Sequence, residues 1–150
     1  MSSYQLPSTP SEESRDRGPI SDCPGKRILV VDDEPAIRSL LARVLSREGY
    51  LVDVAADGEE AWRTIQTRDH VGAIVDLKMP GLGGQEFWER LEMLDTALVP
   101  KVIFMTGDTA SHDSRDFISA TGNPLIEKPF DLVEVLRVVQ RHLDAGARGE

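Results

Sequence analysis

Short apolar runs alternate with amphipathic stretches from Lys26 onward, and this alternation restricts the possible folds more than any other feature of the chain. Ile28–Val31 and Val102–Met105 are unbroken apolar runs, which is typical of strands covered on both faces. Between such runs, apolar residues recur at helical spacing, as at Ile37 and Leu41. Strands that alternate with helices predict an α/β domain in which a parallel sheet carries helices on both faces.

The pattern predicts five strands and five helices. The strands are expected at 28–31, 51–55, 73–77, 102–106 and 125–126. The helices are expected from 35 to the glycine at 49, after the aspartate at 57, at 85–94, near 111–120, and from the cap at 131 to 143. In the third helix, Phe87, Leu91 and Leu94 are expected to share the buried face.

Composition limits both the domain organisation and the classes of function. Residues 1–25 are rich in serine and proline, and we expect them, like 144–150, to be flexible tails around a single domain at 26–143. The net charge of −9 argues against nucleic acid or an anionic membrane surface as the main partner. No run is long enough for a membrane span, and no secretory signal is visible, so we expect a cytoplasmic protein. Because Cys23 is the only cysteine, an internal disulfide and a multi-thiolate metal site are excluded.

Polar side chains lie near or just after the carboxyl ends of the predicted strands, where α/β proteins bind their ligands. They are Asp32, Asp33, Asp76, Thr106 and Lys128. Clustered carboxylates repel one another unless a cation joins them. A ligand set that offers only oxygen atoms favours Mg²⁺, Ca²⁺ or Mn²⁺.

Four motifs stand on successive strands: VVDDE at 30–34, VDLKMPGLGG at 75–84, MTGD at 105–108 and EKPF at 127–130. Together they resemble the receiver domain of two-component response regulators, over Lys26 to about Leu143. The resemblance implies a flavodoxin-like (βα)5 fold, doubly wound, with the five parallel strands in the order 2-1-3-4-5. It also implies a signalling domain that is not an enzyme, apart from catalysing its own phosphotransfer and slow autodephosphorylation.

The resemblance gives each of these residues a role. Asp76 would be the phosphoacceptor, assisted by Thr106 and Lys128, which would contact phosphoryl oxygens. Mg²⁺, or Mn²⁺ as a substitute, would be held by Asp33, Asp76 and the backbone carbonyl of Lys78, while Asp32 would hold a metal-bound water. These roles are physically consistent, because the metal ion and the ammonium neutralise the charge that develops as a carboxylate attacks an anionic phosphate.

The resemblance also implies the partners. The phosphoryl group would come from a sensor histidine kinase or a histidine phosphotransfer protein. An output partner would contact the face made by the fourth helix, the fifth strand and the last helix. The chain would be a monomer or weak homodimer, and either a stand-alone regulator or the receiver portion of a hybrid kinase. Leu125 departs from the family, in which an aromatic residue is common at this position, so an aromatic switch is not expected.

The sequence leaves two other functions open. A phosphohydrolase of the haloacid dehalogenase kind also uses a first-strand aspartate with magnesium, but its Asp-x-Asp motif is not matched because residue 34 is glutamate. A degenerate receiver that acts only as a binding scaffold would lack site residues, whereas all of them are present here.

The Lys128–Pro129 bond is expected to be cis, as is common in receivers. Lys78 and Asp108 are expected to flank the entrance to the site and could pair there.

Overall fold

The computed structural model describes residues 26–79, 81–94, 96–107 and 112–144. The strands are β1 (Arg27–Val31), β2 (Leu51–Ala55), β3 (Gly72–Asp76), β4 (Val102–Thr106) and β5 (Leu125–Glu127). The helices are α1 (Pro35–Arg47), α2 (Gly58–Ile65), α3 (Gly84–Leu94), α4 (His112–Thr121) and α5 (Leu132–Val139). A short 3-10 turn, η4 (Val99–Lys101), precedes β4, and a π-helical turn, η5 (Gln140–Asp144), follows α5.

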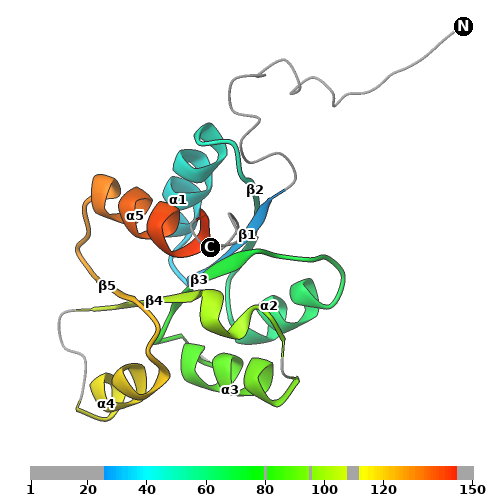
Figure 1. Ribbon diagram of the computed structural model, residues 1–150, viewed down its shortest axis with the longest axis vertical. Helices are drawn as coiled ribbons and strands as arrows, with labels where there is room; N and C mark the ends of the chain where they lie inside the picture. Colours follow the sequence, from blue (N-terminus) through cyan, green and yellow to red (C-terminus); the bar gives the residue numbers. More distant parts are fainter. Residues whose placement is uncertain (1–25, 80, 95, 108–111, 145–150) are drawn as a thin grey trace, which may run out of the picture.

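The strands form one parallel sheet in the order β2-β1-β3-β4-β5, which confirms the predicted topology. Helices α1 and α5 cover one face of this sheet, and α2, α3 and α4 cover the other (Figure 1). Since the chain order reverses beside β1, the carboxyl ends of β1 and β3 lie next to each other at the edge where such folds bind ligands.

Each face of the sheet has its own buried core, because successive side chains of a strand point to opposite faces. Toward α1 and α5, Val30 and Ile74 pack against Leu41 and Val135. On the opposite face, the strands contribute residues such as Phe104 to a core shared with α2, α3 and α4. All residues of β3 and β4 are buried, which explains why their sequences read as continuous rather than alternating apolar runs.

Helix starts follow the capping chemistry of the sequence. Asp57 caps α2 by accepting a hydrogen bond from the N–H of Glu60 at 2.9 Å, and Asp131 caps α5 through the N–H of Val133 at 2.9 Å. In α1, Pro35 occupies the first turn, and the side chain of the N-cap residue Glu34 makes no capping bond. The start of α1 is therefore held by other contacts, which are described below.

The predicted elements agree with the structure to within a few residues, with one error in the assigned core. Leu94 is 56% exposed, although we expected it on the buried face of α3. The buried face is centred on Gly84, Phe87, Trp88 and Leu91, and Leu94, the last residue of α3, lies away from the centre of that face. The predicted tails at 1–25 and 144–150 lie outside the described residues, except for Asp144 at the end of η5. Asp108, which was expected to pair with Lys78, also lies outside them.

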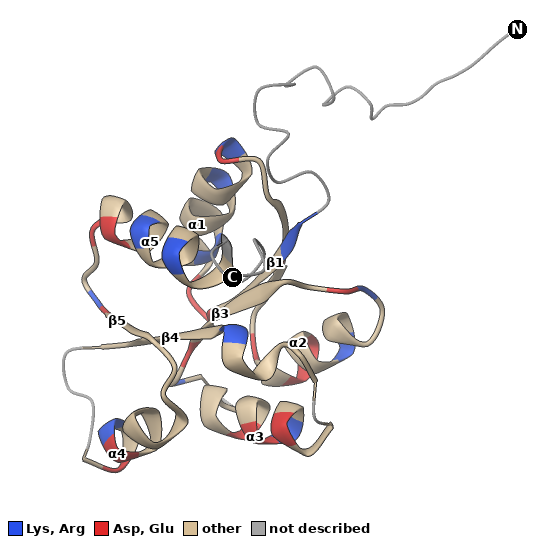
Figure 2. Ribbon diagram, viewed as in Figure 1, with Lys and Arg blue, Asp and Glu red and all other residues tan. Residues whose placement is uncertain are grey.

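Charged residues lie on the helices and at strand ends, while the strands themselves are mostly free of charge (Figure 2). Basic and acidic residues are interspersed on the helices in this view rather than gathered into one basic face. Within the described residues, no helix combines the length and the apolar character needed to cross a membrane.

Candidate functional site

Asp32 of the candidate site is fully buried, and both its backbone and its side chain are hydrogen-bonded. Its backbone N–H donates to the carbonyl of Ala55 at 3.1 Å, and its own carbonyl accepts from the guanidinium of Arg38 at 2.8 Å. Its side-chain Oδ1 accepts from the N–H of Glu34 at 2.9 Å, and Oδ2 accepts from Nζ of Lys128 at 2.9 Å. A buried carboxylate is tolerated here because each of its oxygens has a donor.

Asp76 ends β3 with its side chain 7% exposed, directly beside Lys128. Its Oδ2 lies 3.1 Å from Nζ of Lys128, and its Oδ1 accepts from the backbone N–H of Lys78 at 3.2 Å. Burial raises the pKa of the Asp76 carboxyl and the nearby charge of Asp32 adds to this, while Lys128 acts in the opposite direction. The net pKa of Asp76 is above its ordinary value, so the site favours the neutral form more than water does.

Lys128 joins three carboxylates at the carboxyl edge of the sheet. Besides Asp32 and Asp76, its Nζ lies 3.3 Å from Oε1 of Glu34, whose side chain is 61% exposed. Burial by itself lowers the pKa of Lys128, but the hydrogen bonds and charges of Asp32 and Asp76 outweigh it and the net pKa is raised. The ammonium therefore stays charged and supplies the counter-ion for the buried carboxylates. The peptide bond between Lys128 and Pro129 is cis, as predicted.

Thr106 ends β4 and is fully buried, yet its hydroxyl oxygen has no hydrogen-bond partner among the described residues. Its backbone is in regular pairing, since the carbonyl of Thr106 accepts from the N–H of Lys128 at 2.8 Å. An unpartnered buried hydroxyl costs free energy, so a strand position with no other demand would favour valine. The hydroxyl of Thr106 is therefore available to a ligand.

Asp33 completes an acidic cluster with Asp32 and Asp76. One carboxylate oxygen from each residue can be chosen so that all three lie within 4.8 Å of one another. Asp32 and Asp76 are buried and Asp33 is exposed, so the cluster opens to solvent on the Asp33 side. Carboxylate oxygens from three residues suit a hard divalent cation, and burial together with the nearby charge of Asp32 raises the pKa of Asp76. The residues present therefore fit a Mg²⁺ ion.

The turn after β3 brings backbone close to Asp76. A Cβ atom at Gly84 would lie 2.6 Å from the carbonyl oxygen of Asp76, so only glycine allows α3 to start this close to the site. Gly81 has φ of 72°, in the left-handed region that favours glycine. The glycines of the VDLKMPGLGG motif thus shape the turn.

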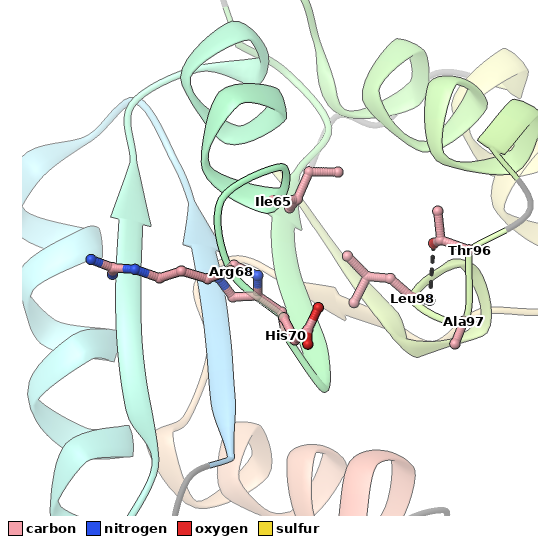
Figure 3. A pocket seen from close by; sticks show the side chains of 7 residues that line it. Ile65, Arg68, His70, Thr96, Ala97 and Leu98 are labelled. Atoms are coloured by element: carbon pink, nitrogen blue, oxygen red, sulfur yellow. Dashed lines mark hydrogen bonds between the residues drawn. The ribbon is translucent and has the colours of Figure 1, made fainter.

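Two hollows lie at opposite ends of the strands, one at their carboxyl ends and one at their amino ends. The first, of about 490 Å³, adjoins Lys128 and is mainly apolar, with Ile37, Leu40, Pro129 and Phe130 in its lining. The second, of about 300 Å³, lies before β3 and β4, between residues 65–70 and 96–98 (Figure 3). It contains no predicted site residue, so only the first hollow is in position to serve the acidic cluster.

The second hollow borders a network built around Asp53 of β2. The Asp53 carboxylate accepts from Arg27 at 3.1 Å, from Arg68 at 2.6 Å and from Nε2 of His70 at 2.9 Å. Arg68 accordingly extends away from the hollow, toward β2 (Figure 3). The side chain of His70 is fully buried, and its Nδ1 has no partner among the described residues. This network fastens the edge strand β2 and the loop before β3.

The predicted side chains lie together at one edge. The structure places Asp32, Asp33 and Asp76 in one cluster, with Lys128 bonded to two of them and Thr106 on the neighbouring strand. Lys78 contacts Asp76 through its N–H, and a metal-binding role for its carbonyl stays a prediction. Sequence reasoning missed two further contacts, Glu34 to Lys128 and Arg38 to the Asp32 carbonyl. Glu34 follows the acidic pair directly, but nothing in the sequence distinguishes Arg38 from the other arginines of α1.

Comparisons with known proteins agree with this geometry. A family model described as the response regulator receiver domain matches residues 28–140, and the chain belongs to this family. The protein functions in two-component signalling as a response-regulator receiver domain. The predicted fold class and the predicted family are thereby confirmed.

The relatives include regulators of different sizes. The chain is 35% identical to the transcriptional regulatory protein TcrA of Mycobacterium tuberculosis, in a match covering 83% of this chain and 51% of that protein. It is 32% identical to sporulation initiation phosphotransferase F of Bacillus subtilis, over 79% of this chain and 94% of that protein. The chain spans about half the length of the first curated relatives that it matches.

Solved structures show the same fold. A CheY-like response regulator receiver domain protein from Methanospirillum hungatei JF-1 is 31% identical, with a TM-score of 0.76, and the match covers 84% of this chain and 99% of that one. The response regulator TrrA from Thermotoga maritima, in complex with Mg(2+)-BeF, is 36% identical with a TM-score of 0.68. That match covers 79% of this chain and 99% of that chain.

Proposed function

We propose that Asp76 accepts a phosphoryl group from a phosphohistidine, carried by a sensor histidine kinase or a histidine phosphotransfer protein. The observation that carries this proposal is the environment of Asp76, a nearly buried carboxylate bonded to the ammonium of Lys128 at 3.1 Å. Thr106, at the end of the neighbouring strand, has a buried hydroxyl with no partner among the described residues. Nucleophile, cation and free hydroxyl therefore lie at the carboxyl ends of three neighbouring strands, with Lys128 directly after β5.

The transfer is a displacement at phosphorus. A carboxylate oxygen of Asp76 attacks the phosphorus atom in line with the donor nitrogen, the P–N bond breaks, and the electron pair returns to the imidazole. The product is an acyl phosphate on Asp76. Dephosphorylation is slow hydrolysis, in which water attacks the same phosphorus, the P–O bond to Asp76 breaks, and inorganic phosphate leaves the free carboxylate behind. The domain therefore catalyses only its own phosphorylation and dephosphorylation.

Lys128 and Thr106 assist by binding phosphoryl oxygens. In the structure Lys128 is committed to Asp32 and Asp76, and we propose that it turns one of its N–H bonds to a phosphoryl oxygen once Asp76 is modified. The hydroxyl of Thr106 donates to another oxygen and so obtains the partner it lacks. Both bonds strengthen as negative charge builds on the phosphoryl group.

Asp33, Asp76 and the carbonyl of Lys78 would hold Mg²⁺, with Mn²⁺ as a substitute, and Asp32 would hold a metal-bound water. When bound, the ion neutralises phosphoryl charge and lowers the repulsion between nucleophile and donor. The acidic cluster supports this assignment, as does TrrA, a relative that is 36% identical and whose structure is in complex with Mg(2+)-BeF.

The hollow beside Lys128 is where we propose that the donor protein docks. Its lining is mainly apolar, and Lys128 and Glu34 form part of its wall, so a donor domain seated there would bring its phosphohistidine to the site. Signal output would use the face of α4, β5 and α5. We propose a cytoplasmic monomer or weak homodimer, either stand-alone or part of a hybrid kinase.

The test is phosphorylation by a small-molecule donor such as acetyl phosphate with Mg²⁺. Intact-mass spectrometry is expected to show one added phosphoryl group on the wild type, and peptide mapping to place it on Asp76. Asp76→Asn is expected to remain unmodified. A phosphoryl group on another residue, or none on the wild type, would contradict the proposal.

The same experiment separates the other candidate functions. A phosphohydrolase would release phosphate continuously from an excess of a generic ester such as p-nitrophenyl phosphate. A scaffold would show neither turnover nor acyl phosphate. The three carboxylates, Lys128 and Thr106 together favour the phosphoacceptor over both.

A further inference from the structure

Arg38 of α1 makes a contact that the proposed phosphotransfer does not use. Its Nη1 donates a hydrogen bond of 2.8 Å to the backbone carbonyl of Asp32, in a partly buried position. Within the same turn, the N–H of Arg38 donates to the carbonyl of Glu34 at 3.1 Å. The guanidinium thus connects the first turn of α1 back to the end of β1.

The first turn of α1 has no conventional side-chain cap. Glu34 occupies the N-cap position, but its side chain makes no capping bond and lies 3.3 Å from Lys128 instead. The junction between β1 and α1 therefore depends on the bond from Asp32 Oδ1 to the Glu34 N–H and on the bond from Arg38 to the Asp32 carbonyl. Removal of either bond would loosen the three acidic residues at this junction.

The carbonyl that Arg38 holds belongs to the peptide unit between Asp32 and Asp33. The orientation of that peptide determines the direction in which the Asp33 side chain leaves the backbone. Asp33 is exposed, and no hydrogen bond or ion pair to its side chain is found within the described part of the chain. Its place in the acidic cluster consequently depends on its backbone.

We propose that Arg38 is a positioning residue for the divalent cation, which fixes the Asp32–Asp33 peptide so that the Asp33 carboxylate points into the acidic cluster. The inference rests on the proposed metal-binding role of Asp33. Arg38 has acidic neighbours at 32–34, yet it donates to a carbonyl, which leaves the carboxylates available to Lys128 and to the ion. Groups that orient metal ligands contribute strongly to metal affinity, although they do not touch the metal.

When Arg38 is replaced by a neutral residue, the proposal predicts weaker Mg²⁺ binding, whereas the change in charge alone predicts tighter binding. Loss of a nearby positive charge strengthens the attraction between the acidic cluster and a cation. Loss of a positioning bond weakens cation binding, because Asp33 must then be ordered when the ion binds. Replacement of Arg38 by a neutral residue thus separates the two explanations.

The experiment measures the Mg²⁺ affinity of the unphosphorylated chain by calorimetry. We expect Arg38→Met, which keeps much of the apolar stem, to bind Mg²⁺ about tenfold more weakly than the wild type. Arg43→Met is the matched control, because Arg43 is exposed on the same helix and loses the same charge. This control is expected to bind Mg²⁺ as the wild type does, or slightly more tightly. Arg38→Lys, which can still reach a carbonyl, is expected to recover most of the affinity.

Equal or tighter Mg²⁺ binding by Arg38→Met than by Arg43→Met would overturn the inference. If thermal melts show that Arg38→Met does not fold, the same comparison is made between Arg38→Gln and Arg43→Gln. A wild type that binds no Mg²⁺ would also overturn it. Phosphorylation of Asp76 is measured on the same wild-type sample, so failure of the phosphoacceptor role is seen separately from failure of the Arg38 role.

Discussion

Lys128 and Asp76 are bonded to each other across the carboxyl edge of the sheet, with Nζ of Lys128 3.1 Å from Oδ2 of Asp76. The same Nζ lies 2.9 Å from Oδ2 of the fully buried Asp32. One ammonium therefore balances two buried carboxylates, and the free energy of the metal-free fold depends on it. The arrangement also keeps the lysine next to the oxygen that would be phosphorylated.

Replacement of Lys128 is expected to destabilise the fold. Lys128→Gln leaves the buried Asp32 and Asp76 without their counter-ion, and loss of one partner of a buried ion pair typically costs about 3–5 kcal/mol. We expect added Mg²⁺ to restore part of the loss, because it supplies positive charge to the same carboxylates. Urea denaturation in EDTA and in Mg²⁺ measures both effects.

Lys78→Gln is the matched control for that measurement. It removes an equal charge from an exposed position two residues after Asp76, and its effect on the free energy of unfolding is expected to stay within about 0.5 kcal/mol. If the two variants unfold at the same urea concentration, Lys128 does not stabilise the carboxylates.

The pKa of Asp76 predicts how stability depends on pH. Because this pKa is raised on folding, the folded state binds the proton of Asp76 more tightly than the unfolded state does, and ionised Asp76 opposes folding at neutral pH. Asp76→Asn is therefore expected to have a higher free energy of unfolding than the wild type at neutral pH in EDTA. The advantage should shrink as the pH falls through the raised pKa of Asp76 and vanish below its ordinary value. A difference that is independent of pH would refute this explanation.

The hydroxyl of Thr106 is expected to be dispensable for folding. Thr106→Val keeps the shape and removes a buried oxygen without a partner, so the free energy of unfolding should be unchanged or higher by up to about 1–3 kcal/mol. Phosphorylation by acetyl phosphate should be slower. Thr121→Val is the control, because Oγ1 of Thr121 bonds both the carbonyl of Ile118 and the N–H of Asn123, and its loss should destabilise the fold. A strongly destabilised Thr106→Val would indicate a partner for this hydroxyl.

Much of the fold could be predicted because its signals are local. Val102–Met105 is continuously apolar because both faces of β4 are covered, and Asp57 marks the start of α2 because its side chain accepts a backbone N–H. The residues of the candidate site were predictable for a related reason: parallel strands bring their carboxyl ends to one edge, so Asp76 and Thr106 become neighbours once their strands are recognised.

The contacts that escaped prediction depend on side-chain directions in three dimensions. Arg38 and Arg43 lie on the same helix, and only the path of the chain after β1 brings one of them to the Asp32 carbonyl. His70 gives no local signal of its bond to Asp53, which is 17 residues away. Leu94 was misplaced because a periodic pattern gives the angle of a helix face only to within about one residue.

Asp33 is expected to lower the stability of the metal-free domain. It adds a negative charge to a cluster in which Lys128 bonds only Asp32 and Asp76 of the three carboxylates. Asp33→Ala should therefore raise the free energy of unfolding in EDTA, by about 0.5–1 kcal/mol for such a solvent-exposed charge, and should abolish Mg²⁺-dependent phosphorylation. The thermal melt is the measurement, and a less stable Asp33→Ala in EDTA would argue against the repulsion.

Phosphorylation is expected to reach α4 through an aromatic contact. Phe117 of α4 packs edge-on against both Trp88 of α3 and Phe104 of β4, with ring centroids 5.5 Å apart in each pair. Leu125 pairs with Phe104 in the sheet, so a displacement of α4 relative to β4 and β5 would alter the surroundings of Trp88.

Since Trp88 is one of two tryptophans, Trp62→Phe leaves it as the single fluorescent reporter. In this variant we expect phosphorylation to change the Trp88 emission and to raise hydrogen-exchange protection in α4, which we expect to be the least protected helix beforehand. The same variant carrying Asp76→Asn should show neither change when it is treated with the donor. Unchanged emission and unchanged exchange in the fully phosphorylated protein would exclude α4 from the signalling response.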